Sequence, residues 1–183
     1  MTAVVQALGR LEAAPVGVSF DACYQAHAPR VYRWGLRFGA GSRSFAEDLT
    51  HDVFVRLLEE LPRLDAPDDV GGWLYRVTAN LALSRLKRER SFLARFERLF
   101  GAQAEVGPDR SLELRQDARR ALQALEALPA KERVALSMKL LDGKSQREIA
   151  DALSMSEGYV SKLVTRAWGR LRAAGWEVSD VEA

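Results

Sequence analysis

The sequence is poor in the residues that form disulfides, metal sites and catalytic centres. Its 183 residues include one cysteine and two histidines, Cys23, His27 and His51. A single cysteine cannot close an internal disulfide, and the Cys23–His27 pair supplies two ligands where a structural zinc needs about four. The patterns GxSxG, HExxH and GxxxxGK[ST] are also missing. We therefore expect no metal, no cofactor and no enzymatic activity, with Cys23 a buried thiol.

Long apolar stretches and an export signal are lacking as well. Charge-free segments such as residues 13–20 fall far short of the roughly 18 to 20 apolar residues that a membrane helix needs. The opening MTAVVQALGR has no basic region, no long apolar core and no small-residue cleavage site. These features exclude a transmembrane helix and favour a cytoplasmic location.

Charge is abundant, and it is divided unevenly along the chain. The 27 basic and 25 acidic residues give a net charge of only +2. Residues 47–69 carry eight acidic residues against two basic ones, whereas residues 85–98 carry six basic residues against two acidic ones. Residues 113–175 are again net basic. The later segments suit phosphate neutralisation, while the acidic block needs a different partner.

The hydrophobic pattern is helical throughout, without the alternation of a β-hairpin. We therefore expect an all-α protein. A first helix is expected over residues 20–38. A second is expected to begin at Ser44, with Glu47 completing a capping box, and to stop at Pro62. After a polar loop, a third helix is expected to start at about Trp73. The expected core face of the second helix consists of Leu49, Val53, Leu57 and Leu61.

A change in composition over residues 101–111 divides the helices into two blocks. This GAQAEVGPD-containing segment has little apolar content, as a flexible linker does. We expect a tail over 1–19, a domain over 20–100, the linker, a second small domain over 112–176 and a tail over 177–183. An apolar stripe from Phe92 to Phe100 extends the third helix, and it could be covered within the chain or hold a partner.

The strongest local motif lies near residues 145–171. Ser145 and Glu148 form a capping box, a short helix follows to Leu153, and Ser154–Ser156 turns into a longer helix. This pattern is typical of a helix-turn-helix, which reads DNA with the exposed face of its second helix. A plain helical hairpin with a solvated charged face is the alternative. The candidate DNA contacts are Ser156, Glu157, Tyr159, Ser161, Lys162, Thr165 and Arg166, with Arg170 a further phosphate contact.

Several segments in the same order resemble one known family. Residues 46–54 read AEDLTHDVF, residues 73–82 read WLYRVTANLA, and the helix-turn-helix region follows with Leu128-Pro129, Glu148-Ile149-Ala150 and Arg166-Ala167. These segments resemble the extracytoplasmic-function (ECF) group of the bacterial sigma-70 family, over residues 20–175. The resemblance implies two helical domains, sigma regions 2 and 4. It also implies an alternative sigma factor that directs promoter recognition, DNA melting and transcription initiation.

The resemblance also implies partners and their contacts. Core RNA polymerase would bind the second helix, promoter DNA would bind both domains, and an anti-sigma factor would hold the protein inactive. The core-polymerase contacts would be Asp48, Leu49, Asp52, Val53, Phe54, Arg56 and Glu59. The contacts to the minus-ten element would be Trp73, Tyr75, Arg76, Asn80, Ser84, Lys87 and Arg88. The helix-turn-helix set given above would read the minus-thirty-five element.

Some residues depart from the family pattern. His51 replaces the usual Gln, Ser84 the usual Asp and Ser154 a turn Gly, and the recognition helix is atypical, so no promoter sequence is transferred. Some of the proposed contacts have an alternative, purely structural role. Trp73 and Tyr75 could be core aromatics, and the acidic residues could form a solvated helix face. Two other functions remain open, a one-component transcription regulator and a protein-binding adaptor. The regulator would leave the acidic helix and the WLYR segment unexplained.

Overall fold

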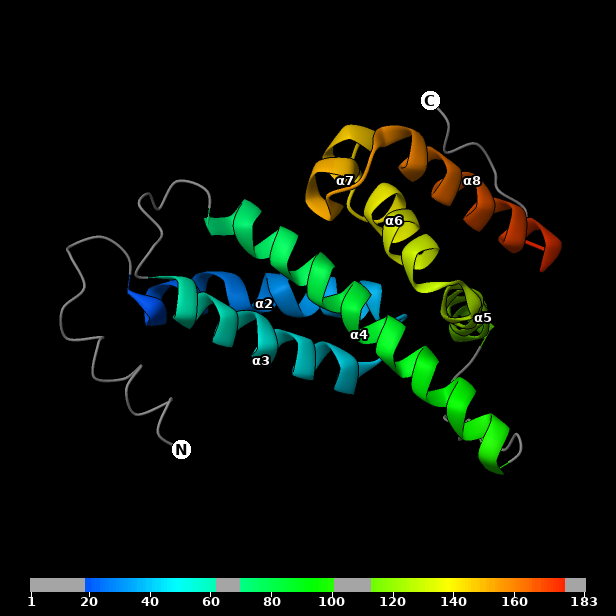
Figure 1. Cartoon of the computed structure of the whole chain (residues 1–183), viewed down its shortest axis with the longest axis horizontal. Coiled ribbons are helices and arrows are strands. Elements are labelled where there is room, and N and C mark those ends of the chain that lie inside the picture. Colours follow the sequence, from blue (N-terminus) through cyan, green and yellow to red (C-terminus); the bar gives the residue numbers. More distant parts are fainter. Residues whose placement is uncertain (1–18, 62–69, 101–112, 177–183) are drawn as a thin grey trace.

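The computed structural model describes residues 19–61, 70–100 and 113–176, and the regular structure within these ranges is entirely helical (Figure 1). This confirms the all-α class. The predicted tails, the predicted linker and Pro62 lie outside the described ranges. The helices are α2 (Phe20–Phe38), α3 (Arg43–Glu60), α4 (Val70–Phe100), α5 (Glu113–Ala127), α6 (Ala130–Leu140), α7 (Gln146–Leu153) and α8 (Glu157–Ala173).

Helices α2, α3 and α4 pack against one another as the first domain. Their shared core includes the fully buried side chains of Phe38, Leu49, Leu57 and Leu74. Helices α2 and α3 approach closely at Gly35, where a Cβ atom would lie 2.9 Å from the Cα atom of Ala46. The predicted core face of α3 is confirmed for Leu49, Val53 and Leu57, which are fully buried, whereas Leu61 at the end of the helix is only partly buried.

The predicted start of the second helix was wrong by two residues. Ser42, not Ser44, is the N-cap of α3, and its hydroxyl accepts a hydrogen bond from the Phe45 N–H at 3.3 Å. Gly41 directly before it has a φ of +84°, which turns the chain sharply between α2 and α3. Ser42 is extended and can cap, whereas Ser44 already lies inside the first turn. The predicted Ser44–Glu47 capping box does not form.

Helices α6, α7 and α8 pack together in the second domain. Its core includes Leu136, Met138, Ile149 and Val160, all fully buried. The capping box at the start of α7 is confirmed: the Ser145 N–H donates to the Glu148 carboxylate at 2.8 Å, and the Glu148 N–H donates to the Ser145 hydroxyl at 3.2 Å. These contacts fix where the first helix of the helix-turn-helix begins.

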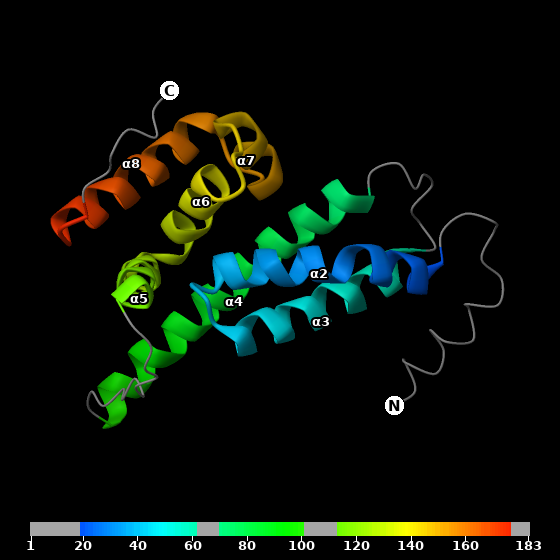
Figure 2. The same cartoon turned by 180° about the vertical axis from the view of Figure 1, so that it is seen from behind.

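The two domains are in contact within the described residues. Helices α6 and α7 lie against α4, and α6 also reaches α2. Figures 1 and 2 show α7 and the adjoining end of α6 over the middle of α4, with α8 on the far side of the second domain. The N-terminal half of α4 thus faces two neighbours, the first domain and α7.

Candidate protein and nucleic-acid interfaces

The acidic face of α3 is tied to α4 by one arginine. Arg85 donates to the Asp48 carboxylate at 2.8 Å and to the Asp52 carboxylate at 2.7 Å. The two aspartate side chains remain 62% and 39% exposed, so a partner can still reach them. From the sequence, Arg85 could be assigned only to a basic segment, because no local pattern relates residues more than thirty positions apart.

Three of the predicted core-polymerase contacts lie inside the first domain. Leu49 and Val53 are completely buried and Phe54 is 3% exposed. A partner could not touch the first two without unfolding α3, so their assignment as direct contacts is corrected to core packing. Arg56 and Glu59 are exposed and lie 3.9 Å apart as an ion pair on the same helix.

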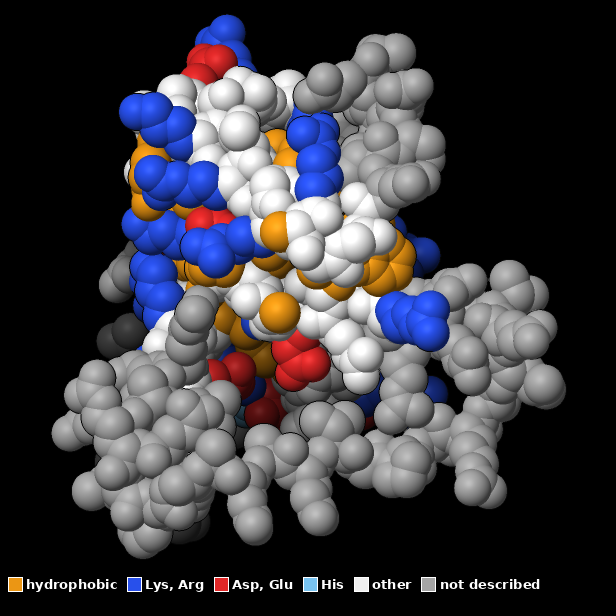
Figure 3. Space-filling view, turned by 90° about the vertical axis from the view of Figure 1, so that its right-hand side faces the viewer, with side chains coloured by type: hydrophobic (Ala, Val, Ile, Leu, Met, Phe, Trp, Pro, Cys, Tyr) orange, Lys and Arg blue, Asp and Glu red, His pale blue; other side chains and the backbone are white. Residues whose placement is uncertain are grey.

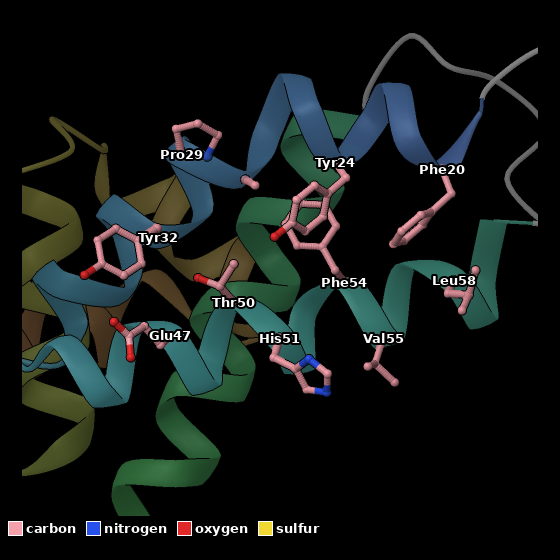
Figure 4. A pocket seen from close by; sticks show the side chains of 11 residues that line it. Phe20, Tyr24, Pro29, Tyr32, Glu47, Thr50, His51, Phe54, Val55 and Leu58 are labelled. Carbon is pink, nitrogen blue, oxygen red and sulfur yellow. The ribbon is translucent and has the colours of Figure 1, made fainter. Parts of the chain in front are cut away.

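An apolar groove of about 560 Å³ runs between α2 and α3 beside the acidic face. Its aromatic wall includes Tyr24 and Phe54, whose ring centroids lie 4.7 Å apart. Figure 4 shows Phe54 pointing toward Tyr24, whereas His51 and Val55 project from α3 away from α2. Tyr24 and Val55, which both line this groove, are 47% and 44% exposed. Neither Tyr24 nor Val55 was predicted as a site residue, although an apolar residue on the outer face of an amphipathic helix can be recognised from its position in the sequence.

The predicted minus-ten residues of α4 fall into two groups. Arg76, Asn80, Ser84, Lys87 and Arg88 are exposed, and Trp73 is partly buried against the core. Arg76, Ser84, Lys87 and Arg88 are therefore open to a ligand, whereas the Asn80 side-chain amide already donates to the Ala152 carbonyl of α7 at 2.8 Å.

Tyr75 belongs to the core, so its assignment as a minus-ten contact is corrected. Its side chain is 8% exposed and packs edge-to-face on Trp34, with ring centroids 4.8 Å apart. Its hydroxyl donates to the Asp142 carboxylate at 2.8 Å. Burial first, and then this carboxylate, raises the pKa of the phenol, which stays protonated. This is the core-aromatic alternative that the sequence left open.

The turn of the helix-turn-helix is confirmed despite the missing glycine. Ser154 adopts the left-handed conformation, with φ of 53° and ψ of 50°. The Met155 N–H closes on the Ala150 carbonyl at 2.9 Å, and Ala150 is buried where α7 meets α8. Ser156 then caps α8 by accepting from the Tyr159 N–H at 3.3 Å. The turn therefore has the geometry that glycine would give it, at the cost of strain in a residue with a Cβ.

The predicted reading face of α8 is largely open. Glu157, Lys162, Thr165 and Arg166 are exposed, Tyr159 and Ser161 are partly buried, and Ser156 acts as the cap. The Lys131 ammonium lies 5.0 Å from the centre of the Tyr159 ring. Figure 3 shows Lys and Arg side chains gathered along one side of this end of the molecule. Such a face has the charge and the hydrogen-bond donors that DNA requires.

One predicted phosphate contact has an internal partner. The Arg170 guanidinium donates to the Glu132 carboxylate at 2.9 Å, and Glu132 is 5% exposed on α6. The pair joins α8 to α6 and satisfies an otherwise isolated buried charge. Arg170 therefore positions the recognition helix within its domain.

The described residues contain no group of three or more His, Cys, Asp or Glu side chains arranged for a metal ion. Cys23 is buried in the first domain, and burial raises the pKa of its thiol. Among the helices in the described ranges, none is both long enough and apolar enough to span a bilayer.

Comparison with known proteins adds a family relationship to this geometry. Residues 23–92 match the family model described as Sigma-70 region 2, and residues 118–171 match Sigma-70, region 4. The chain is 32% identical over 176 residues to the ECF RNA polymerase sigma factor SigE of Mycolicibacterium smegmatis, covering 93% of this chain but only 66% of SigE. It is 28% identical over 181 residues to the RNA polymerase sigma factor NccH of Alcaligenes xylosoxydans xylosoxydans, covering 93% of this chain and 94% of NccH.

A solved structure has the same fold. The sigma factor RpoE from Bartonella quintana, in complex with the anti-sigma factor NepR, superposes with a TM-score of 0.59 at 20% identity. The match covers 84% of this chain and 94% of RpoE. At this identity the likeness concerns the arrangement of the helices.

Proposed function

The chain belongs to the ECF group of the sigma-70 family, and we propose that it is an alternative sigma factor that binds core RNA polymerase and directs promoter recognition, DNA melting and transcription initiation. The observation that carries the proposal is the order of the two matched regions, residues 23–92 and 118–171. A one-component regulator is not favoured, because it would need the second region alone and would leave the first without a role.

Each interface has a part in this function. The exposed side of α3 docks on core polymerase through Asp48, Asp52 and Glu59, with His51 and Val55 beside them. The face of α4 with Arg76, Asn80 and Lys87 holds the minus-ten element, since unstacked bases and their phosphates need polar side chains and cations on one surface. The exposed face of α8 reads the minus-thirty-five element.

The remaining partners and the setting follow from the same proposal. The protein acts in the cytoplasm, where core polymerase is found, and supplies no catalysis of its own because RNA synthesis belongs to the polymerase. RpoE was solved with an anti-sigma factor bound. We extend that kind of partner to this chain.

Run-off transcription tests the proposal. Purified bacterial core polymerase is incubated with a library of promoter templates, with and without this protein. New discrete start sites that require the protein are the expected result. If the protein neither binds core polymerase nor creates start sites on any template, the proposal is contradicted, and the one-component regulator becomes the better hypothesis.

A further inference from the structure

The apolar groove between α2 and α3 is a surface that the other described helices leave open. All the residues that line it belong to α2 or α3. Helix α4 packs on both of these helices and passes behind them in Figure 4. The α2–α3 groove therefore has two helical walls, and no described helix lies over them.

The lining of the groove suits an occupant with apolar side chains. Phe20, Tyr24 and Phe54 form an aromatic cluster whose ring centroids lie 4.7 to 6.2 Å apart. The Thr50 hydroxyl, which also lines the groove, donates to the Ala46 carbonyl of its own helix at 2.7 Å and needs no partner from an occupant. Covering such a surface with other apolar side chains removes it from water and is favourable.

The residues directly before α2 have a sequence pattern that matches this surface. Residues 1–18 lie outside the described ranges, and α2 begins at Phe20, which is itself a groove residue. In the sequence, Val4, Leu8 and Leu11 are spaced by four and by three, which places them on one face of a helix. The pattern therefore predicts an amphipathic helix whose apolar face needs a surface to pack on.

Such a helix is too short to be stable without a partner. Pro15 ends it at about residue 14, because the residue before a proline disfavours the helical conformation. Gly9 lies in its middle, and glycine is a weak helix former. Isolated helices shorter than about 12–15 residues are marginal in water. We therefore expect the helix to form only against an apolar surface.

The groove and the segment have similar lengths. Along α2 the lining residues run from Phe20 to Tyr32, which is about 18 Å at ~1.5 Å per residue. A helix over residues 3–14 is also about 18 Å long. Residues 15–19 can span about 16–18 Å, which is more than the roughly 8–10 Å between the axes of packed helices. The chain can therefore turn back at Phe20 and place the helix along the groove, antiparallel to α2.

We propose that residues 3–14 form a helix that docks in the α2–α3 groove, with Val4, Leu8 and Leu11 against its apolar lining. Val55 at the edge of the groove also belongs to the side of α3 that is proposed to dock on core polymerase, so the helix and the polymerase compete for this side. The competition rests on the proposed function, whereas the docking of the helix does not. When a surface is free in only a fraction of the molecules, the apparent affinity for its partner falls by that fraction.

Hydrogen–deuterium exchange of the full chain tests the docking without polymerase. In the wild type, the amides of residues 3–14 are expected to exchange about tenfold or more slowly than unprotected amides. Leu8→Asp places a charge on the apolar face and is expected to remove this protection. Gln6→Asp is the matched control, because it introduces the same residue on the opposite face of the same helix, and it should keep the protection.

A change in the groove itself locates the helix. Val55→Asp alters an exposed groove residue and leaves the sequence of the segment unchanged, and it is expected to lower the protection of residues 3–14. Wild-type protection of α3 and α4 in the same samples establishes that each variant remains folded.

Three results would overturn the docking. The first is a wild type in which residues 3–14 exchange as fast as unprotected amides, or a protection that Leu8→Asp leaves intact. The second is a protection that Leu8→Asp removes and Val55→Asp leaves unchanged, since the helix would then lie on another surface. The third is a protection that rises with protein concentration, which would assign the groove to the helix of a neighbouring copy.

Binding to core polymerase tests what the helix covers. Fluorescence anisotropy compares the labelled full-length wild type, Leu8→Asp and Gln6→Asp. Leu8→Asp is expected to bind core polymerase on the order of tenfold more tightly than the other two, because its groove is always free. Equal affinities, with the exchange protection lost only in Leu8→Asp, would overturn the competition. Failure of all three to bind core polymerase would count against the proposed function, while the exchange results would still decide whether the helix docks.

Discussion

The pairing of Arg85 with both Asp48 and Asp52 allows the docking role of the α3 acidic residues to be separated from their structural role. Two variants break the same ion pairs from opposite sides: Arg85→Ala, and Asp48→Asn combined with Asp52→Asn. The pairs are 2.8 and 2.7 Å long, but the Asp48 and Asp52 side chains are still 62% and 39% exposed. Exposed pairs contribute about 0.2–1 kcal/mol each, so each variant is expected to lose about 0.5–2 kcal/mol of unfolding free energy. The loss should shrink at high salt.

Binding to core polymerase is expected to differ between the two variants although their stabilities are similar. The aspartate variant loses two charges that would face the polymerase, and we expect its affinity to fall about tenfold or more, equivalent to about 1.4 kcal/mol. Arg85→Ala leaves both carboxylates free and is expected to bind as tightly as the wild type or better. Fluorescence anisotropy with labelled protein measures both, and urea titration measures stability. Wild-type affinity in the aspartate variant would refute acidic docking by α3.

Three further changes test local structure. Gly35→Ala places a Cβ against the Ala46 backbone and is expected to cost about 1–3 kcal/mol in urea unfolding, whereas Gly169→Ala, with open space around it, should be neutral or stabilising. Ser154→Gly relieves a left-handed conformation and should stabilise the protein by up to about 1 kcal/mol without weakening DNA binding; a loss of stability would contradict the strain. Hydrogen bonds from Lys144 first, and then from Ser145, lower the pKa of Glu148 from 4.5 to about 2. The contribution of the cap to stability is therefore complete above about pH 4.5 and is lost as the pH falls toward 2. Thermal melts of the wild type and Glu148→Ala should converge at acid pH. A difference in melting temperature that persists at pH 2 would count against the ionised cap.

Local patterns in the sequence predicted most of the helices because those patterns act over a few residues. The Ser145–Glu148 capping box and the buried positions of α3 depend on spacings of three and four, which can be read directly. The start of α3 was misplaced because Ser42 and Ser44 are both good caps, and only the left-handed turn at Gly41 selects between them. The sequence shows which residues can cap a helix, but it does not always show which of them has the extended backbone that capping requires.

The contacts that join helices could not be predicted in this way. Asp142 and Arg37 are 105 positions apart and Asp48 and Arg85 are 37 apart, and neither pair belongs to a periodic pattern. Tyr75 shows the consequence. Its position in WLYR is compatible with a surface aromatic or a core aromatic, and the choice depends on Trp34 and Asp142, which only the fold brings to it.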